Sequence, residues 1–141
     1  MYKFGKRSLD NLVGVHPNLV KIMTEAIKTS PVDFTITEGV RTTKEQQQLY
    51  AQGRTTKGPI VTNKNGTTNK SNHQAKSDGY GHAVDLYPFF EGSVQVQHKD
   101  TIARLKQIAK HIKDVAKKLG IGITWGGDWK SPYDPPHFEL K

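Results

Sequence analysis

The sequence contains no cysteine among its 141 residues. Disulfide bonds are therefore excluded, and so are zinc sites built from thiolates. Any metal ion must be bound by histidine, aspartate or glutamate, and zinc accepts both imidazole nitrogen and carboxylate oxygen. The absence of cysteine thus narrows the metal chemistry without excluding a metalloenzyme.

Long apolar runs are also missing from the sequence. No segment has the roughly 20 apolar residues that a membrane-spanning helix needs, so we expect no insertion into a membrane. The first seven residues lack the apolar stretch of a secretory signal peptide. We therefore expect synthesis in the cytoplasm, and any role outside it requires another exit route.

Acidic residues are few relative to basic ones: 13 aspartates and glutamates against 21 lysines and arginines, a net charge of +8. This excess favours an anionic partner, either nucleic acid or an anionic bacterial surface. No basic run exceeds two residues, which is not typical of a disordered nucleic-acid-binding tail. The length suggests one domain over residues 1–141. The 13 glycines and 7 prolines indicate long loops rather than a helical bundle.

The order of predicted elements indicates an α+β fold. The patterns predict helices at 8–29, 43–52 and 101–119, and strands at 34–37, 82–87, 121–125 and 137–140. The segments between them are expected to be a long polar loop at 53–81, a second loop at 88–98 and a turn at 126–128. We therefore expect a small antiparallel sheet packed with about three helices.

The predicted helix ends rest on a few residue types. Pro17 stands near the start of the second piece of the 8–29 region. Thr43 and Gln46, three residues apart, fit a capping box. Asp100 is expected to cap the long helix, and Gly120 to end it.

Three residues far apart in the chain, His73, Asp85 and His137, are predicted to bind one zinc ion. His73 lies in the polar loop, Asp85 in an apolar strand and His137 at the start of the last strand. Asp85 is informative because a buried carboxylate is costly unless a cation or hydrogen-bond donors accompany it. Three protein ligands leave the fourth zinc position for a reacting water.

Each ligand assignment has an alternative. A loop histidine such as His73 is also typical of a surface, and Asp85 could make a structural hydrogen bond instead. His82 competes as a ligand because it lies three residues from Asp85. On a strand, however, that odd spacing turns the two side chains to opposite faces.

Four further residues suit the hydrolysis of an amide. Asp134 precedes His137 by three residues, with two stiffening prolines between them; it is predicted as the general base, a simple turn being the alternative. Glu139 shares a strand face with His137 and is expected to hold a ligand rather than the metal. Arg41 is expected to stabilise the developing oxyanion, unless it is merely solvated, and Gln46 to bind a substrate amide.

Three blocks of sequence resemble the zinc-dependent peptidases of the D-alanyl-D-alanine carboxypeptidase and L-alanyl-D-glutamate endopeptidase group. The blocks are Gly39-Val40-Arg41-Thr42 with Gln46 and Leu49-Tyr50, then Ser71-x-His73 with Gly81-x-Ala83-x-Asp85, and finally Asp134 to Leu140. The resemblance runs from about Phe34 to Leu140. It is greatest to single-domain phage endolysins and bacterial wall hydrolases.

The middle block departs from the spacing of that group. The group has two residues between the histidine and the glycine, whereas seven separate His73 from Gly81, which implies an insertion of five. Strict register would place Asp78 at the ligand position. We predict His73 instead, because it keeps the Ser-x-His pair and imidazole suits zinc better than a second carboxylate.

The resemblance also implies a function. It implies one zinc ion, Asp134 as the base, Arg41 directed at the substrate carbonyl, and Gln46 and Ser71 lining the cleft. It implies peptidoglycan as the partner rather than nucleic acid, with cleavage between L-Ala and D-Glu and lysis of bacteria after membrane permeabilisation. The layout is compatible with a monomer. The alternatives are a D,D-carboxypeptidase or dipeptidase, and a non-catalytic cationic module that binds the cell wall.

Overall fold

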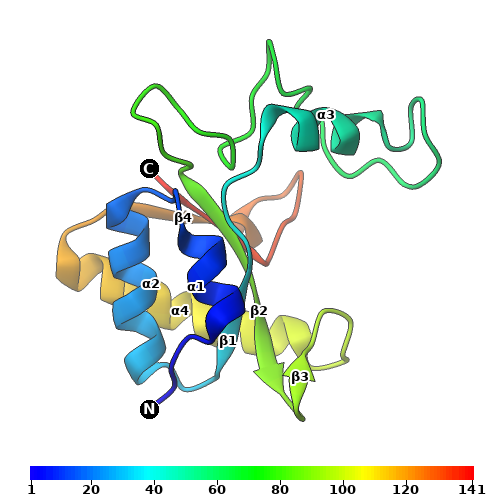
Figure 1. Cartoon of the computed structure of the whole chain (residues 1–141). Coiled ribbons are helices and arrows are strands. Elements are labelled where there is room, and N and C mark those ends of the chain that lie inside the picture. The colour runs from blue at the N-terminus through cyan, green and yellow to red at the C-terminus, as the bar shows by residue number, and fades with distance from the viewer.

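Four α-helices and five β-strands make up the fold, and the computed structural model describes all residues, 1–141 (Figure 1). The helices are α1 (Lys6–Leu12), α2 (Pro17–Thr29), α3 (Thr43–Ala51) and α4 (Thr101–Leu119). The strands are β1 (Phe34–Glu38), β2 (Ala83–Phe90), β3 (Ser93–Val94), β4 (Ile123–Trp125) and β5 (His137–Leu140), and a short 3-10 helix, η1, covers Gly126–Asp128. The α+β prediction is confirmed, with four helices rather than about three.

The sheet is antiparallel throughout and runs in the order β1-β2-β5-β4, with β3 paired to the far end of β2. In the β2–β5 pair, Asp85 stands opposite His137 and Ala83 opposite Glu139. On the other side of β2, the register with β1 shifts between Ile36 and Glu38. The pairing therefore joins an aspartate and a histidine that lie far apart in the sequence.

One hydrophobic core of 19 buried residues holds α1, α2 and α4 to the sheet. The apolar stripe of α4 is buried at Leu105, Ile108 and Ile112 as its spacing predicts, whereas Ile102 in the first turn is 42% exposed. The helix ends at Gly120, whose φ of 72° is left-handed, a conformation that glycine adopts at little cost. This stripe packs against α2 and β2, and its burial contributes to the hydrophobic stabilisation of the fold.

Several predicted helix boundaries are corrected by the structure. The 8–29 region forms two helices with Pro17 in the first turn of α2, as predicted, but α1 already begins at Lys6. The predicted capping box of Thr43 and Gln46 is wrong by one residue. Thr42 Oγ1 accepts from the Glu45 amide at 3.1 Å, and Glu45 Oε1 accepts from the Thr42 amide at 3.0 Å. Both pairs have the same spacing, so local sequence alone did not separate them.

The other corrections concern loops and a cap. Asp100 precedes α4 but makes no side-chain capping bond. Strand β2 continues to Phe90 and pairs with β3 inside the predicted 88–98 loop. The predicted 121–125 strand begins only at Ile123, and residues 126–128 form η1 rather than a plain turn.

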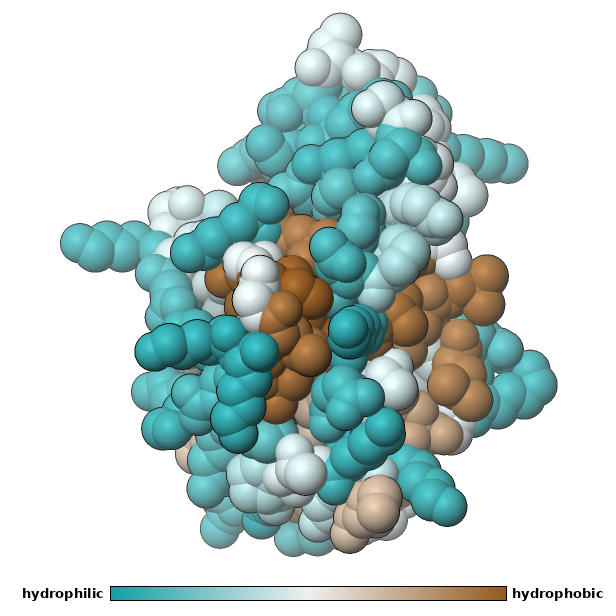
Figure 2. Space-filling model, turned by 90° about the vertical axis from the view of Figure 1, so that its left-hand side faces the viewer, coloured by the Kyte–Doolittle hydropathy of each residue, from teal (hydrophilic) through white to brown (hydrophobic).

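Between α3 and β2 the chain is irregular, as the polar composition of residues 53–81 predicts. This segment and α3 lie at the end of the molecule where β2 begins (Figure 1). On the face drawn in Figure 2, that end is mostly hydrophilic, whereas hydrophobic residues gather across the middle of the molecule. None of the helices combines the length and apolar composition needed to cross a bilayer.

Candidate active site

The structure brings His73, Asp85 and His137 together at the start of β2. His73 Nε2 and His137 Nδ1 are 3.2 Å apart, and each lies 3.3 Å from Asp85 Oδ1. A tetrahedral metal ion with bonds of about 2.0 Å places its ligand atoms about 3.3 Å from one another. The three atoms therefore have the spacing of three corners of such a coordination shell.

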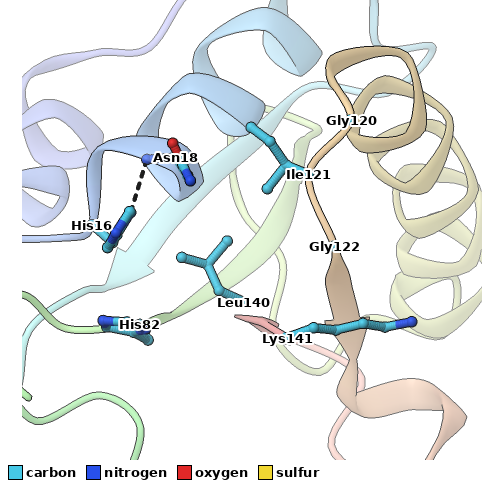
Figure 3. Close-up of a pocket in the computed structure, with 8 residues that line it drawn as sticks. All are labelled: His16, Asn18, His82, Gly120, Ile121, Gly122, Leu140 and Lys141. Carbon is cyan, nitrogen blue, oxygen red and sulfur yellow. Dashed lines mark hydrogen bonds between the residues drawn. The ribbon is translucent and has the colours of Figure 1, made fainter.

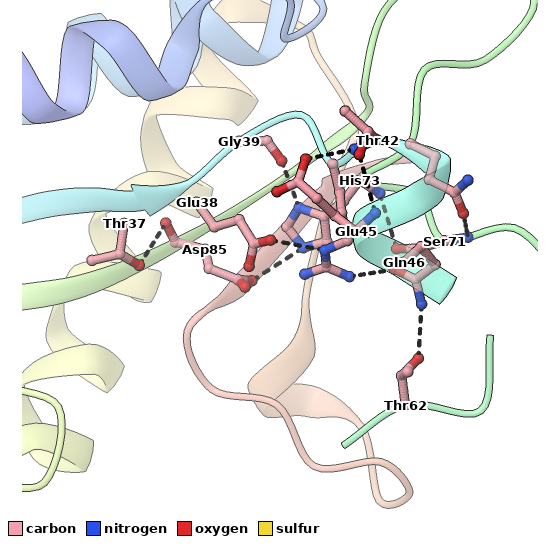
Figure 4. Close-up of polar contacts among 12 residues, drawn as sticks. Thr37, Glu38, Gly39, Thr42, Glu45, Gln46, Thr62, Ser71, His73 and Asp85 are labelled. Carbon is pink, nitrogen blue, oxygen red and sulfur yellow. Dashed lines mark hydrogen bonds and ion pairs between the residues drawn. The ribbon is translucent and has the colours of Figure 1, made fainter. Parts of the chain in front are cut away.

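Hydrogen bonds on the far side of each imidazole determine which nitrogen carries the proton. His73 Nδ1 donates to the carbonyl oxygen of Gly39 at 3.0 Å (Figure 4). His137 Nε2 donates to Glu139 Oε1 at 2.7 Å. Because these partners can only accept, the nitrogens that face each other carry lone pairs in the neutral rings.

The same arrangement leaves Asp85 Oδ1 buried without a hydrogen-bond partner. Two lone pairs and a carboxylate oxygen thus converge in a buried place, which is unfavourable unless a cation joins them. Burial opposes protonation of His137, but the neighbouring carboxylates of Asp85 and Glu139 raise the pKa of His137 to about 9, which favours a positive charge at this place. Metal binding displaces such protons. These residues could hold a metal ion.

Contacts from distant segments position the ligands. Asp85 and His137 are neighbours across β2 and β5. His73 is carried by the irregular segment, and its carbonyl oxygen accepts from the backbone amide of Arg41 at 2.9 Å. Its own amide donates to Ser71 Oγ at 3.2 Å. Ser71 therefore helps to fix the backbone conformation of His73.

Glu139 lies behind His137 rather than among the ligand atoms. Its second carboxylate oxygen accepts from Asn72 Nδ2 at 2.8 Å. Although burial opposes ionisation, the bonds from His137 and Asn72 lower the pKa of Glu139. An ionised carboxylate fixed in this way holds the His137 ring in one orientation and increases its basicity as a ligand.

Asp134 lies beside the ligand cluster, with its Oδ2 atom 3.8 Å from His137 Nδ1. Burial and the neighbouring charge of Asp85 raise the pKa of Asp134. The backbone of Asp134 is held by a hydrogen bond that its amide donates to the Gly126 carbonyl oxygen at 3.0 Å. A side chain at residue 126 would not fit, because its Cβ would lie 2.2 Å from the Asp134 carbonyl oxygen.

Arg41 is mostly buried, and two acceptors hold its guanidinium. Its Nε donates to Glu38 Oε1 at 2.8 Å, and its Nη1 to Gln46 Oε1 at 2.7 Å. The remaining nitrogen, Nη2, makes no hydrogen bond within the protein. Arg41 lines the same cleft as the three ligands, so this free end of the guanidinium belongs to the site.

Gln46 does not line the cleft. Its side chain is fully buried, and its amide group donates to Thr62 Oγ1 at 3.2 Å and to the Lys64 carbonyl at 2.8 Å (Figure 4). Gln46 therefore joins Arg41 to residues 62–64 instead of facing a substrate. Ser71, by contrast, does line the cleft.

The cleft around these residues has a volume of about 630 Å³. The cleft is lined by residues 60–64 and by Trp129, Pro132 and Asp134, among others. Ile60 and Val61 are 58% and 55% exposed, so they offer apolar surface to a ligand. An extended peptide could occupy this space with its backbone beside the ligand cluster.

Two residues of the site were not predicted from the sequence, Glu38 and Asn72. Their only local signals are the three-residue spacing of Glu38 and Arg41 and the position of Asn72 beside His73. Asp78 and His82, the alternatives to His73, lie with His16 in a separate cluster.

Comparison with known proteins identifies a matching family and similar enzymes. The family described as phage L-alanyl-D-glutamate peptidase matches residues 1–140. The chain is 33% identical over 141 residues to the L-alanyl-D-glutamate peptidase of Escherichia phage T5, covering 99% of this chain and 90% of that protein. It is 38% identical over 132 residues to the peptidoglycan L-alanyl-D-glutamate endopeptidase CwlK of Bacillus subtilis, covering 89% of this chain and 73% of that protein.

A solved structure agrees with these sequence matches. The crystal structure of the Serratia marcescens L-Ala D-Glu endopeptidase ChiX superposes with a TM-score of 0.75 at 31% identity, covering 99% of this chain and 90% of that one. The family match over nearly the whole length and these relatives confirm the resemblance seen in the three sequence blocks. The chain belongs to the phage L-alanyl-D-glutamate peptidase family.

Proposed function

We propose that residues 1–141 form one zinc peptidase domain that hydrolyses the L-Ala–D-Glu amide bond of the peptidoglycan stem peptide. The observation that carries the proposal is the buried triangle of His73 Nε2, Asp85 Oδ1 and His137 Nδ1, with sides of 3.2–3.3 Å. The activities of the relatives, an L-alanyl-D-glutamate peptidase and an L-alanyl-D-glutamate endopeptidase, support the choice of bond. The net charge of +8 suits approach to an anionic cell wall.

The donor set favours zinc among the common metal ions. Two imidazole nitrogens and one carboxylate oxygen form a three-ligand set of the kind found in catalytic zinc sites, which leave a position open. Zinc, when bound, lowers the pKa of its water and polarises a carbonyl group. A calcium or magnesium site would offer oxygen ligands almost exclusively.

The residues around the cluster then have distinct roles. Asp134 accepts the proton of the attacking water and returns it to the amide nitrogen as the peptide bond breaks, and its raised pKa makes it a stronger base than an ordinary carboxylate. Arg41 directs its unpaired Nη2 to the carbonyl oxygen, where negative charge develops. Glu139 keeps the His137 ring in its ligating orientation.

Gln46 acts through Arg41 in this proposal rather than by binding substrate. It accepts from Nη1 and is itself held by residues 62–64. Ser71 supports the backbone of His73 and lines the cleft. We further propose that the protein acts as a monomer on the cell wall once the membrane has been permeabilised, because one chain supplies every residue of the site.

The test of this function is the chemistry of the product. Purified peptidoglycan is incubated with the protein, and the freed amino and carboxyl termini are identified by mass spectrometry. We expect new D-Glu amino groups and L-Ala carboxyl groups in equal amounts. Release of free D-Ala would identify a D,D-carboxypeptidase instead. Salt-sensitive binding without new termini would identify a cationic wall-binding module.

Glu139→Gln is expected to weaken zinc binding by roughly 10–100-fold, because the neutral amide no longer increases the basicity of His137. The dissociation constant is measured by competition with a chromogenic chelator. Glu91→Gln is the matched control, since Glu91 also lies beside a histidine, 3.3 Å from His98, but at the surface. Equal affinities in the wild type and Glu139→Gln would contradict the role of Glu139.

Gln46→Met is expected to lower kcat/KM for wall cleavage by roughly 10–100-fold, because a hydrogen bond to a charged group is lost. If Gln46 acts through Arg41, the substitution has little further effect in an Arg41→Ala background. Gln48→Met, on an exposed position of the same helix, is the control. Additive losses in the double variant would show that Gln46 acts independently of Arg41.

A further inference from the structure

A second group of metal-binding side chains lies outside the cleft. His82 Nε2 is 2.7 Å from Asp78 Oδ2, and His16 Nε2 is 4.0 Å from the same oxygen. One ligand atom from each of these three residues lies within 4.8 Å of the others. His16 stands at the start of α2, whereas Asp78 and His82 come from the segment that leads into β2.

This group is separate from the candidate active site. Neither His16, Asp78 nor His82 lines the cleft. His16 and His82 instead border a hollow of about 280 Å³ on the surface, together with Leu140 and Lys141 (Figure 3). The three side chains are 20–40% exposed, so solvent can reach them.

We propose that His16, Asp78 and His82 form a second site for a divalent transition-metal ion. Two imidazoles and one carboxylate suit zinc, nickel or copper, and they do not suit calcium or magnesium. The open side of the group leaves the remaining coordination positions to water. The proposal does not depend on the peptidase activity.

The protein holds the carboxylate and the two rings in place before any ion binds. Asp78 Oδ1 accepts from the backbone amide of Tyr80 at 2.9 Å, which leaves Oδ2 turned to the imidazoles. The two rings pack edge to face with centroids 5.0 Å apart. The backbones are joined as well, because the His16 amide donates to the Gly81 carbonyl at 2.9 Å.

The protons on the two imidazole rings can move to permit metal binding. In the metal-free protein His82 Nε2 donates to Asp78, and its Nδ1 makes no hydrogen bond within the protein. The proton can therefore move to Nδ1 and free Nε2 for a metal. His16 Nδ1 accepts from the Asn18 amide at 3.0 Å (Figure 3). Binding through His16 Nε2 gives up this one capping bond of α2 and gains a metal–imidazole bond.

The position of the site suggests what the ion does. The stretch from His73 to Asp85 has an active-site ligand at each end and Asp78 and His82 between them. Asp78 also lies within the seven residues where the chain is longer than the family pattern predicts. An ion here would fasten this longer segment to the first turn of α2. The ion would therefore restrain the segment that carries His73.

The experiment counts bound zinc ions per chain by equilibrium dialysis against zinc in excess, followed by elemental analysis. We expect two ions in the wild type and one in the Asp78→Asn/His82→Gln variant. Asparagine at 78 keeps an oxygen that can accept from Tyr80. His16→Gln, on a different element, is also expected to retain one ion. His98→Gln is the control and should retain two, since His98 lies 3.3 Å from Glu91 but has no second histidine beside it.

Two further measurements make the result decisive. The variants should cleave peptidoglycan at the wild-type rate with one equivalent of zinc, and excess zinc should raise the melting temperature of the wild type more than theirs. Equal ion counts in the wild type, the double variant and His16→Gln overturn the proposal. Failure of the wild type to cleave peptidoglycan would overturn the proposed function but would leave the difference of one ion between the wild type and these variants as the test of the second site.

Discussion

Removing the active-site zinc should reduce cleavage of peptidoglycan to the level of a no-enzyme control. We expect a loss of roughly a thousandfold or more, because the ion supplies several kcal/mol of transition-state stabilisation and each 1.4 kcal/mol is a factor of ten in rate. The protein is dialysed against a strong zinc chelator, and the rate at which new amino termini form is measured. One equivalent of zinc should restore the rate, and calcium should not.

The ligand variants make this result specific to the buried triangle. His137→Gln is expected to lose the ion and the activity together, since one of three ligands is gone and Glu139 loses its partner. His98→Gln serves as the matched control, because it removes a histidine that belongs to neither metal-binding group and does not line the cleft. Full activity in the chelated wild type would reject the metal mechanism.

Asp134→Asn should lower kcat by roughly 10²–10⁴-fold while the zinc content stays at the wild-type level. The amide cannot take a proton from water, but the three ligand atoms are unchanged. Single-turnover cleavage of a stem-peptide substrate measures the chemical step, and elemental analysis measures the zinc. A loss of kcat with bound zinc retained would distinguish a base from a metal ligand.

Asp128→Asn is the control for Asp134→Asn. Asp128 lies in η1, close in sequence to Asp134, and its carboxylate pairs with Lys113 at the surface. We expect this variant to keep its activity. Wild-type activity in Asp134→Asn would mean that another group, such as Glu38 of the cleft, accepts the proton.

Short-range patterns were enough to predict the elements and the type of chemistry. Without cysteine, only histidine and carboxylate ligands remained, and an aspartate within an apolar strand pointed to a cation. The stripe of α4 and the alternation in β2 and β5 are local, so the α+β class followed from them. Glu139 could be placed behind His137 because a strand repeats every two residues.

Only the tertiary structure decided between residues whose local patterns are alike. Strict register favoured Asp78 over His73, yet His73 reaches the site because its carbonyl accepts from Arg41 and its ring donates to Gly39. From its sequence block, Gln46 is predicted to bind substrate. In the fold its side chain is fully buried and accepts a hydrogen bond from Arg41. The position of His73 depends on contacts across 32 and 34 residues, and the burial of Gln46 depends on contacts with Thr62 and Lys64, 16 and 18 residues away. Such contacts follow no periodicity, so the sequence holds no local pattern from which they can be derived.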